Sequence, residues 1–234
     1  MEHRPRLNPS EYGLVRGTGR RMLVIPDLHA PFIRKMYFEF VCHIADKYNT
    51  NDVMFLGDLL DNHFSSYHEA DPDGHSAGAE LDKAMTDIAR WYNQFPEARV
   101  CIGNHDSIPQ RKMMTAGLSA KWLKPISEVL DVPNWEFAEE WVVDGVKYCH
   151  GTTRKARNRA KDDLMSVVEA HYHSESYIDH FVGENYKIFA LQLGCGIDRT
   201  AYSMAYGRNF KKMHINVGVV LEDGTLPIIE YMDL

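Results

Sequence analysis

Three short apolar runs, separated by segments of helical periodicity, constrain the fold of this chain more than any other feature. The runs lie at residues 21–26, 53–56 and 99–102, and their length and bounding polar residues are typical of buried strands. Between the runs, apolar residues recur at helical spacing over residues 36–48 and 81–92. The order strand, helix, strand, helix, strand predicts parallel strands joined by right-handed crossovers, and therefore an α/β fold.

The second half of the chain predicts more strands. After helical or irregular segments near residues 110–131, the turn signals Asp144-Gly145 and Asp223-Gly224 indicate hairpins. No repeat, low-complexity stretch or linker divides the sequence, so residues 21–234 are predicted to form one domain that follows a tail over residues 1–20. The strands expected in this half lie at residues 137–143, 146–150, 166–170, 186–193, 215–221 and 226–232.

Composition excludes several classes of protein. The hydrophobic share of 44% and the charged share of 25% are those of an ordinary globular chain, and no run approaches the roughly 18 apolar residues of a membrane span. The opening segment lacks the apolar centre of a secretory signal. The net charge of −7 argues against a surface built for long nucleic-acid duplexes. Widely spaced cysteines without a C-x-x-C pair predict a reducing, cytoplasmic location; they are Cys42, Cys101, Cys149 and Cys195.

Side chains with metal-binding chemistry follow the predicted strands. Carboxylate, amide and imidazole donors suit Zn, Fe, Mn or Ni rather than a soft thiolate metal. Because ligands bind at the carboxyl ends of strands in open α/β sheets, Asp27, Asp58 and Asn104 are predicted to meet at one edge. The donors occur in five segments, in the order Asp27-Leu28-His29, Gly57-Asp58-Leu59-Leu60-Asp61, Gly103-Asn104-His105-Asp106, His150-Gly151 and His171-Tyr172-His173.

Each of these segments is a weak signal by itself. D-x-H and G-D-x-x-D often mark ordinary turns, and an H-x-H pair is more often two solvated strand residues than a metal clamp. In an extended segment, alternation would place Asp27 and His29 on the same face, and the same spacing recurs at His171 and His173. Found together, in this order and each at a strand end, the five segments indicate a metal centre.

The five segments resemble the calcineurin-like metallophosphoesterase family over about residues 22–173. The resemblance implies a two-sheet β-sandwich flanked by helices, a four-layer α/β/β/α fold, and two divalent metal ions, with Mn²⁺ the first choice and Fe, Zn, Ni or Mg the others. One departure is Ala170, which stands where the family usually has glycine, so the backbone at His171 is expected to differ slightly.

The resemblance also implies roles for individual residues. His105 would be the acid that protonates the leaving oxygen, and Asp61 would orient it. Asp58 would bridge the two metals. The first metal would be held by Asp27, His29, Asp58 and His173, and the second by Asp58, Asn104, His150 and His171.

The chemistry expected of such a centre is phosphoester hydrolysis. Two metals about 3.5–4 Å apart can bridge a water and lower its pKa toward about 7, so that hydroxide attacks without a protein nucleophile. The first hypothesis is a phosphodiesterase acting on nucleotides or nucleic acid, supported by the H-x-H pair and by a basic cluster after His150. The alternatives are a phosphomonoesterase, on protein or small molecules, and a non-catalytic metal-binding scaffold. The sequence does not define the substrate or the oligomeric state.

Further candidates are expected to contribute less. The basic cluster could bind phosphates, but a solvated helix face is favoured; it comprises Arg154, Lys155, Arg157, Arg159 and Lys161. Arg111, like Asn104 and Arg154, is a candidate substrate contact, with a surface salt bridge the alternative for Arg111. Loop or packing roles are expected for His63, His68, His75, Tyr202 and Tyr206.

Overall fold

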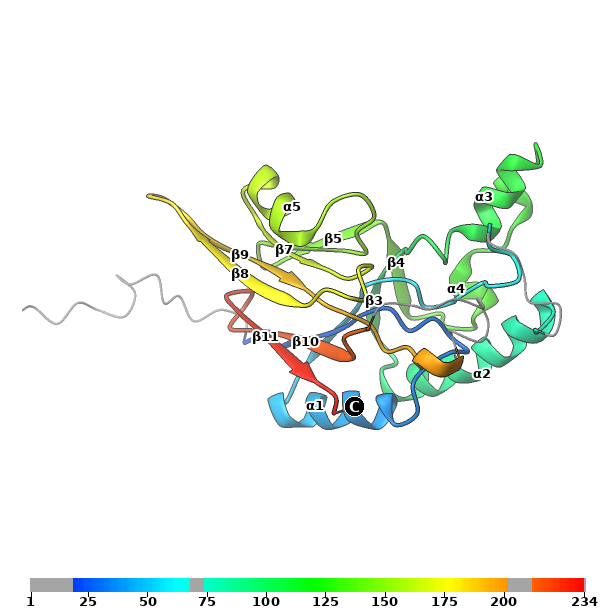
Figure 1. The fold of residues 1–234 in the computed structure, drawn as a ribbon, viewed down its shortest axis with the longest axis horizontal. Coiled ribbons are helices and arrows are strands. Elements are labelled where there is room, and N and C mark those ends of the chain that lie inside the picture. Colours follow the sequence, from blue (N-terminus) through cyan, green and yellow to red (C-terminus); the bar gives the residue numbers. More distant parts are fainter. Residues whose placement is uncertain (1–18, 68–73, 202–211, 234) are drawn as a thin grey trace, which may run out of the picture.

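Two β-sheets pack face to face in the computed structural model, which describes residues 19–67, 74–201 and 212–233 (Figure 1). The first sheet has the order β11-β10-β1-β2-β3-β4. Its parallel strands are β1 (Met22–Ile25), β2 (Asp52–Phe55), β3 (Ala98–Cys101) and β4 (Trp135–Ala138), and antiparallel β10 (Asn216–Leu221) and β11 (Leu226–Tyr231) extend it beyond β1.

The second sheet has the order β5-β6-β7-β9-β8. A parallel centre of β6 (Val146–Cys149), β7 (Ser166–Glu169) and β9 (Lys187–Gln192) is flanked by two antiparallel strands, β5 (Glu140–Val143) and β8 (Tyr177–Val182). The parallel strands of both sheets end near one another, and their ends form the edge that carries the predicted ligands.

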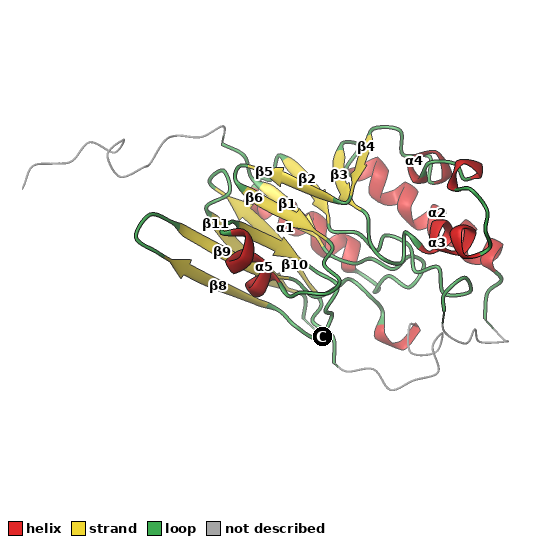
Figure 2. Cartoon of the chain, turned by 90° about the horizontal axis from the view of Figure 1, so that it is seen from above, coloured by secondary structure: helices red, strands yellow, loops and turns green. Residues whose placement is uncertain are grey.

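Helices cover the outer face of each sheet (Figures 1 and 2). The first sheet is covered by α1 (Tyr37–Tyr48) and α2 (Ala77–Gln94), and the second by α5 (Ala156–Asp163). Strand β1 shows why this requires four layers: Leu23 and Ile25 pack toward α1 and α2, whereas Met22 and Val24 pack toward the second sheet. The predicted two-sheet, four-layer fold is confirmed.

The core beneath α2 is built around aromatic side chains. Trp91 is almost fully buried and lies edge-on to Phe55, with ring centroids 5.9 Å apart. Trp135 stands 4.7 Å from Phe55, and its indole N–H donates to the carbonyl oxygen of Phe95 at 2.8 Å. Buried aromatic rings whose polar atom is satisfied contribute several kcal/mol each to a core, typically about 3–5 for truncation to alanine.

Three short helical segments follow β3 and complete the fold. They are α3 (Ile108–Thr115), η2 (Ala120–Trp122) and α4 (Ile126–Val129). Figure 1 shows α3 projecting away from both sheets. No helix within the described ranges is long and apolar enough to cross a membrane.

The structure corrects the sequence expectation at two strands. The single strand expected at residues 137–143 is in fact two, because the chain leaves β4 in the first sheet and enters β5 in the second. Strand β8 was not expected at all; it is an edge strand whose residues are all partly exposed, so it presents no continuous apolar run. Both predicted hairpin turns are present, with positive φ at Asp144-Gly145 and at Asp223-Gly224.

Candidate metal centre

The seven predicted metal ligands converge at the carboxyl ends of strands from both sheets. Asp27, Asp58 and Asn104 follow β1, β2 and β3 of the first sheet. His150 follows β6 of the second sheet directly, and the His171–His173 segment follows β7. Strand ends of the two sheets therefore meet at one place. This brings together residues that lie more than one hundred positions apart in the sequence.

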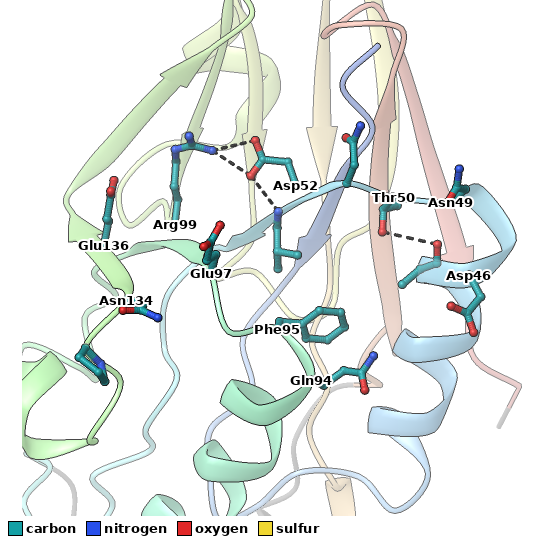
Figure 3. A pocket seen from close by; sticks show the side chains of 15 residues that line it. Asp46, Asn49, Thr50, Asp52, Gln94, Phe95, Glu97, Arg99, Asn134 and Glu136 are labelled. Atoms are coloured by element: carbon teal, nitrogen blue, oxygen red, sulfur yellow. Dashed lines mark hydrogen bonds and ion pairs between the residues drawn. The ribbon is translucent and has the colours of Figure 1, made fainter. Parts of the chain in front are cut away.

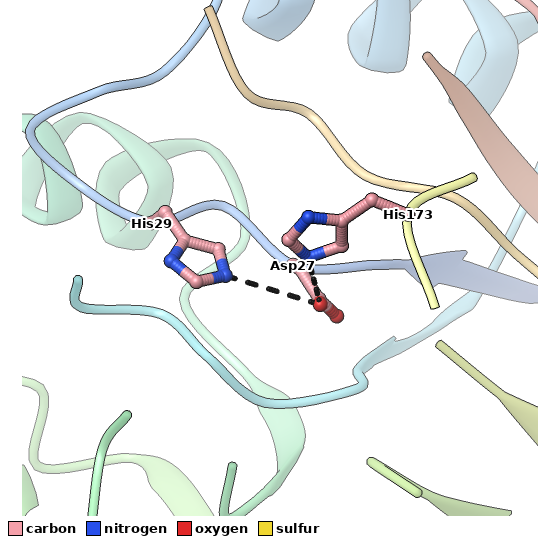
Figure 4. A group of neighbouring side chains, drawn as sticks. All are labelled: Asp27, His29 and His173. Carbon is pink, nitrogen blue, oxygen red and sulfur yellow. Dashed lines mark hydrogen bonds and ion pairs between the residues drawn. The ribbon is translucent and has the colours of Figure 1, made fainter. Parts of the chain in front are cut away.

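The first group of donors is Asp27, His29 and His173 (Figure 4). Nε2 of His173 lies 2.8 Å from Oδ2 of Asp27, and Nε2 of His29 lies 3.9 Å from the same oxygen. Asp27 and His29 are completely buried. A buried carboxylate faced by two imidazole nitrogens has the geometry and the ligand chemistry of a divalent transition-metal site.

The second group surrounds Nε2 of His150. Nδ1 of this ring donates to the carbonyl oxygen of Leu56 at 3.0 Å, which directs Nε2 into the site. Three other donors then lie close to Nε2: Oδ1 of Asn104 at 2.9 Å, Oδ2 of Asp58 at 3.1 Å and Nδ1 of His171 at 3.1 Å. A single proton on Nε2 can serve only one of these lone pairs, whereas a cation among them would serve all four.

Asp58 lies between the two groups. Its Oδ2 is 3.1 Å from Nε2 of His150 and 3.5 Å from Nε2 of His29, while its Oδ1 accepts the backbone N–H of His105 at 2.8 Å. Asp58 also belongs to two sets of donors that could hold an ion, one with His29 and His105 and the other with His150 and His171. Asp58 therefore lies close to donors of both groups.

The charges of the centre are strongly coupled. Burial opposes ionisation of Asp58, yet His150 and the neighbouring imidazoles hold the pKa of this carboxyl well below its usual range. Burial likewise opposes a charge on His150, but Asp58 and Asp27 raise the pKa of His150 to about 9. Without metal, therefore, a proton on His150 balances part of the buried negative charge. A metal ion would have to displace that proton, because only deprotonated imidazole binds metal.

His105 and Asp61 lie beside these ligands in an arrangement that the sequence did not anticipate. Nδ1 of His105 donates to the backbone carbonyl of Asp61 at 2.6 Å, and the Asp61 carboxylate is 3.6 Å away. That carboxylate instead lies 2.6 Å from Nδ1 of His29. Asp61 thus positions His105 through its main chain, and through its side chain it positions His29, a candidate metal ligand. Burial lowers the pKa of His105, with the nearby His29 acting in the same direction.

Left-handed backbone conformations aim several ligands into the centre. His29, Asp58 and His171 have φ values of 49°, 47° and 68°. Asp27 and His29 do approach each other, as expected. However, the left-handed backbone at His29 brings them together, and not the alternation of an extended strand. Non-glycine residues held at positive φ cost on the order of 1–3 kcal/mol each, and such residues cluster at functional sites.

Two glycines of the motifs allow the loops to approach each other. Gly57 has a φ of 93°, and a Cβ placed there would come 2.7 Å from the backbone nitrogen of Gly103. A Cβ at Gly103 would overlap the Asp58 carboxylate and its backbone nitrogen. Asp106 ties the same loops together, since its carboxylate accepts the N–H groups of Gly103 at 3.0 Å and Leu60 at 3.1 Å. Asp106 stands in the G-N-H-D segment, but sequence reasoning gave it no role.

Ala170 fits the site without strain. It is fully buried between the sheets, and its backbone φ angle is not positive. The side-chain amide of Gln192 donates to its carbonyl oxygen at 2.5 Å, which fixes the start of the His171–His173 segment. The carbonyl of Leu56 and the amide of Gln192 both support the ligands, and neither carries a recognisable sequence signal.

Four of the five cations in the basic cluster after His150 are paired with carboxylates. Arg154 pairs with Asp162 at 2.6 Å, Arg157 pairs with Asp179 at 3.1 Å, and Lys161 stands 4.8 Å from the ring centroid of Phe181. The remaining two cations form close ion pairs, Lys155 with Glu175 and Arg159 with Glu169. The favoured prediction of a solvated helix face therefore describes α5 better than a phosphate-binding role.

The other candidates are distributed away from the ligands. Arg111 stacks on Tyr67, with its guanidinium carbon 5.2 Å from the ring centroid. The backbone N–H of His63 donates to Glu80 at 2.7 Å, and His75 lies 2.9 Å from Nζ of Lys83. His68, Tyr202 and Tyr206 lie outside the described residues.

A large open cleft lies at the opposite edge of the first sheet (Figure 3). Its volume is about 750 Å³, and it is lined by the amino ends of β2, β3 and β4. Four acidic residues line it, namely Asp46, Asp52, Glu97 and Glu136, and the guanidinium of Arg99 is engaged by Asp52 at 2.8 Å. This acidic cleft suits neither a phosphoester nor the chemistry of the metal centre.

Comparison with known proteins gives distant structural likenesses only. No family model and no curated protein sequence matches the chain. A structure titled nuclease MPE from Pseudomonas putida is 12% identical with a TM-score of 0.46, covering 88% of this chain and 87% of its own. Vps29 from Chaetomium thermophilum is 11% identical with a TM-score of 0.40, covering 92% and 97%. The E. coli phosphoesterase Yfce is 14% identical with a TM-score of 0.37, covering 91% and 100%. The resemblance to calcineurin-like metallophosphoesterases rests on the motifs and the geometry above.

Proposed function

We propose that this chain is a metal-dependent phosphoester hydrolase of the calcineurin-like type that cleaves phosphodiesters with two divalent cations. The observation that carries the proposal is the position of Asp58 between two donor groups, with its Oδ2 3.5 Å from Nε2 of His29 and 3.1 Å from Nε2 of His150. Asp27, His29 and His173 would hold one cation, and Asn104, His150 and His171 the other. Bound divalent cations would supply Lewis acidity, which lowers the pKa of a water and neutralises charge on phosphoryl oxygens.

The chain's own residues contribute positioning and a proton. Asp61 holds His29 through a 2.6 Å hydrogen bond, and Leu56 fixes the orientation of His150. Nδ1–H of His105 is engaged by the carbonyl of Asp61, so Nε2 is the atom that can carry a proton to a leaving oxygen. This assigns the general-acid role to His105 and the positioning role to Asp61.

The preference for a diester over a monoester is carried by the His171-Tyr172-His173 segment. Its H-x-H spacing resembles the diesterase branches of the calcineurin-like family. The two imidazoles of the segment also lie in different donor groups, His173 with Asp27 and His29, and His171 with Asp58 and His150.

The proposal is tested by comparing a chromogenic bis-ester and the corresponding mono-ester of phosphoric acid, with Mn²⁺ added. We expect faster turnover of the bis-ester. A clear preference for the mono-ester would support a phosphomonoesterase instead. Mn²⁺ bound without turnover of either ester would support a non-catalytic scaffold.

A further inference from the structure

Two loops that leave the metal centre carry exposed aromatic and basic side chains. Phe64 and Tyr67 follow the Gly57–Asp61 segment and are 49% and 55% exposed. Helix α3 follows the Gly103–Asp106 segment, and its Lys112 ammonium stands 4.2 Å from the Tyr67 ring centroid. The side-chain amide of Asn62 donates to the carbonyl oxygen of His105 at 3.0 Å, so the two loops are joined at their base, next to the site.

The segment that begins with α3 has an unusual charge and exposure. Residues 107–127, named here the α3 arm, contain four cations and no acidic residue, in a chain whose net charge is −7. Trp122 is 81% exposed, and Met114 and Leu118 are also well exposed. A tryptophan this exposed contributes little to the core, so folding does not explain its presence. The four cations are Arg111, Lys112, Lys121 and Lys124.

Most cations of the α3 arm are available to a ligand. Among the described residues, only Lys124 of the four forms an ion pair, with Glu128 at 2.6 Å. This distinguishes the arm from the basic cluster at residues 154–161, where Arg154, Arg157 and Arg159 are each paired with a carboxylate. Figure 1 shows α3 extending from the body of the protein, so that a long ligand could contact the arm without meeting the sheets.

Basic side chains interleaved with exposed aromatic rings are suited to single-stranded nucleic acid. Such surfaces bind the backbone phosphates with Lys and Arg and stack unpaired bases on aromatic rings. A duplex would hide the faces of its bases from Trp122, and a purely apolar partner would leave the lysines without a counter-charge. The arm also adjoins a centre whose chemistry acts on phosphoesters.

We propose that the α3 arm, together with Phe64 and Tyr67, binds single-stranded nucleic acid and directs the strand to the metal centre. The proposal rests on the proposed phosphodiesterase function and narrows its substrate to single-stranded DNA or RNA. Phosphates would lie against Lys112 and Lys121, and bases would stack on Trp122.

The test is a binding measurement that requires no catalysis. A labelled oligodeoxythymidine of about twelve nucleotides is titrated with the full chain in the presence of a chelator, and fluorescence anisotropy is recorded at several salt concentrations. We expect binding that weakens steeply with salt. Trp122→Ala should weaken it by about 5- to 100-fold, the range expected for one stacked base, and Trp122→Phe should restore most of the loss.

A second variant tests the phosphate contacts separately. Lys112→Ala should reduce the slope of log affinity against log salt by about 0.7, the contribution of one phosphate contact on a single strand. Lys47→Ala is the matched control, because Lys47 also lies over a tyrosine ring, 5.1 Å from the centroid of Tyr48, but at the far end of α1. This control should bind the oligonucleotide as the unmodified chain does.

The outcomes separate this proposal from the proposed function. If the chain hydrolyses the bis-ester with Mn²⁺ but does not bind the oligonucleotide, the arm proposal is wrong and the phosphodiesterase remains. Equal affinities for Trp122→Ala and Lys47→Ala would also overturn it. If oligonucleotide binding is absent and the chain is a dimer that Trp122→Ala converts to a monomer, the arm is an interface between two copies. Binding with the expected losses, but no ester hydrolysis, would support the arm and refute the enzyme.

Discussion

The substitution Asp61→Asn distinguishes two roles that this carboxylate could have. In the structure the carboxylate lies 2.6 Å from Nδ1 of His29, and both side chains are buried. The carboxylate is 3.6 Å from Nδ1 of His105, a ring that is already held by the Asp61 carbonyl. An amide keeps the size of the side chain and the main-chain bond to His105, but it removes the charge that strengthens His29 as a ligand.

The expected magnitude follows from these contacts. Loss of a buried partner behind a metal ligand typically costs about 10–100-fold in metal affinity, equivalent to about 1.4–2.7 kcal/mol. At saturating metal, turnover of Asp61→Asn should fall by far less than the 10²–10⁴-fold that removal of a general acid costs, because His105 keeps its hydrogen bond.

The measurement is a calorimetric titration with Mn²⁺, followed by bis-ester hydrolysis at saturating Mn²⁺. Asp46→Asn is the control, since it removes the same charge from an exposed position at the opposite edge of the sheet. Unchanged metal affinity combined with a loss of turnover of 10²-fold or more would refute the reasoning, because the carboxylate would then act on His105 and not on His29.

Four further predictions address the centre and its supports. His105→Ala should retain bound metal in elemental analysis while turnover falls by about 10²–10⁴-fold; lost metal would make His105 a ligand. Asp58→Asn should lose metal together with activity, and full occupancy would disprove the bridging position. Gly103→Ala should lower both the melting temperature and Mn²⁺ affinity, because its Cβ overlaps the Asp58 carboxylate; unchanged values would show that the loop is not tightly packed. Burial raises the pKa of Glu80, despite hydrogen bonds from the N–H groups of Phe64 and His63. The folded chain then keeps a proton that the unfolded chain releases just above pH 4.5, so stability falls as pH rises through this window. Urea melts should give the free energies of unfolding of the unmodified chain and of Glu80→Gln. The difference, unmodified chain minus variant, should decrease from about pH 4 to pH 7, and a constant difference would contradict the pKa shift.

The sequence predicted the parallel strands and the convergence of the candidate ligands for one physical reason. A buried strand must be apolar along its length, so a polar residue directly after it, such as Asp27 or Asp58, stands out and also marks the ligand-binding edge. The same logic located His150 and the His171–His173 segment after strands of the second sheet. Convergence of these residues follows from topology and needs no detailed backbone geometry.

Features that depend on backbone detail or on side-chain partners could not be predicted in this way. Nothing local indicates that Asp61 contacts His29 by its side chain and His105 by its carbonyl, because both contacts depend on how the loops fold onto one another. The neutralisation of Arg157 by Asp179 depends on β8, an edge strand without an apolar pattern. The exposure of Trp122 is equally hidden, since an apolar residue in a sequence is normally assigned to the core.

The two sheets contribute different sets of candidate ligands, and this makes the proposed metal centre depend on how they pack. The first sheet supplies the oxygen donors Asp27, Asp58 and Asn104 together with the imidazole of His29, whereas the second supplies imidazoles only, those of His150, His171 and His173. Buried carboxylates without a counter-charge are costly, and His29 alone would leave most of the charge of the first sheet unbalanced at this edge. The apolar layer between the sheets brings the imidazoles opposite them and so allows the carboxylates to remain ionised. Cations bound between the two donor sets would join the sheets at their carboxyl edge, as the apolar side chains join them along their length.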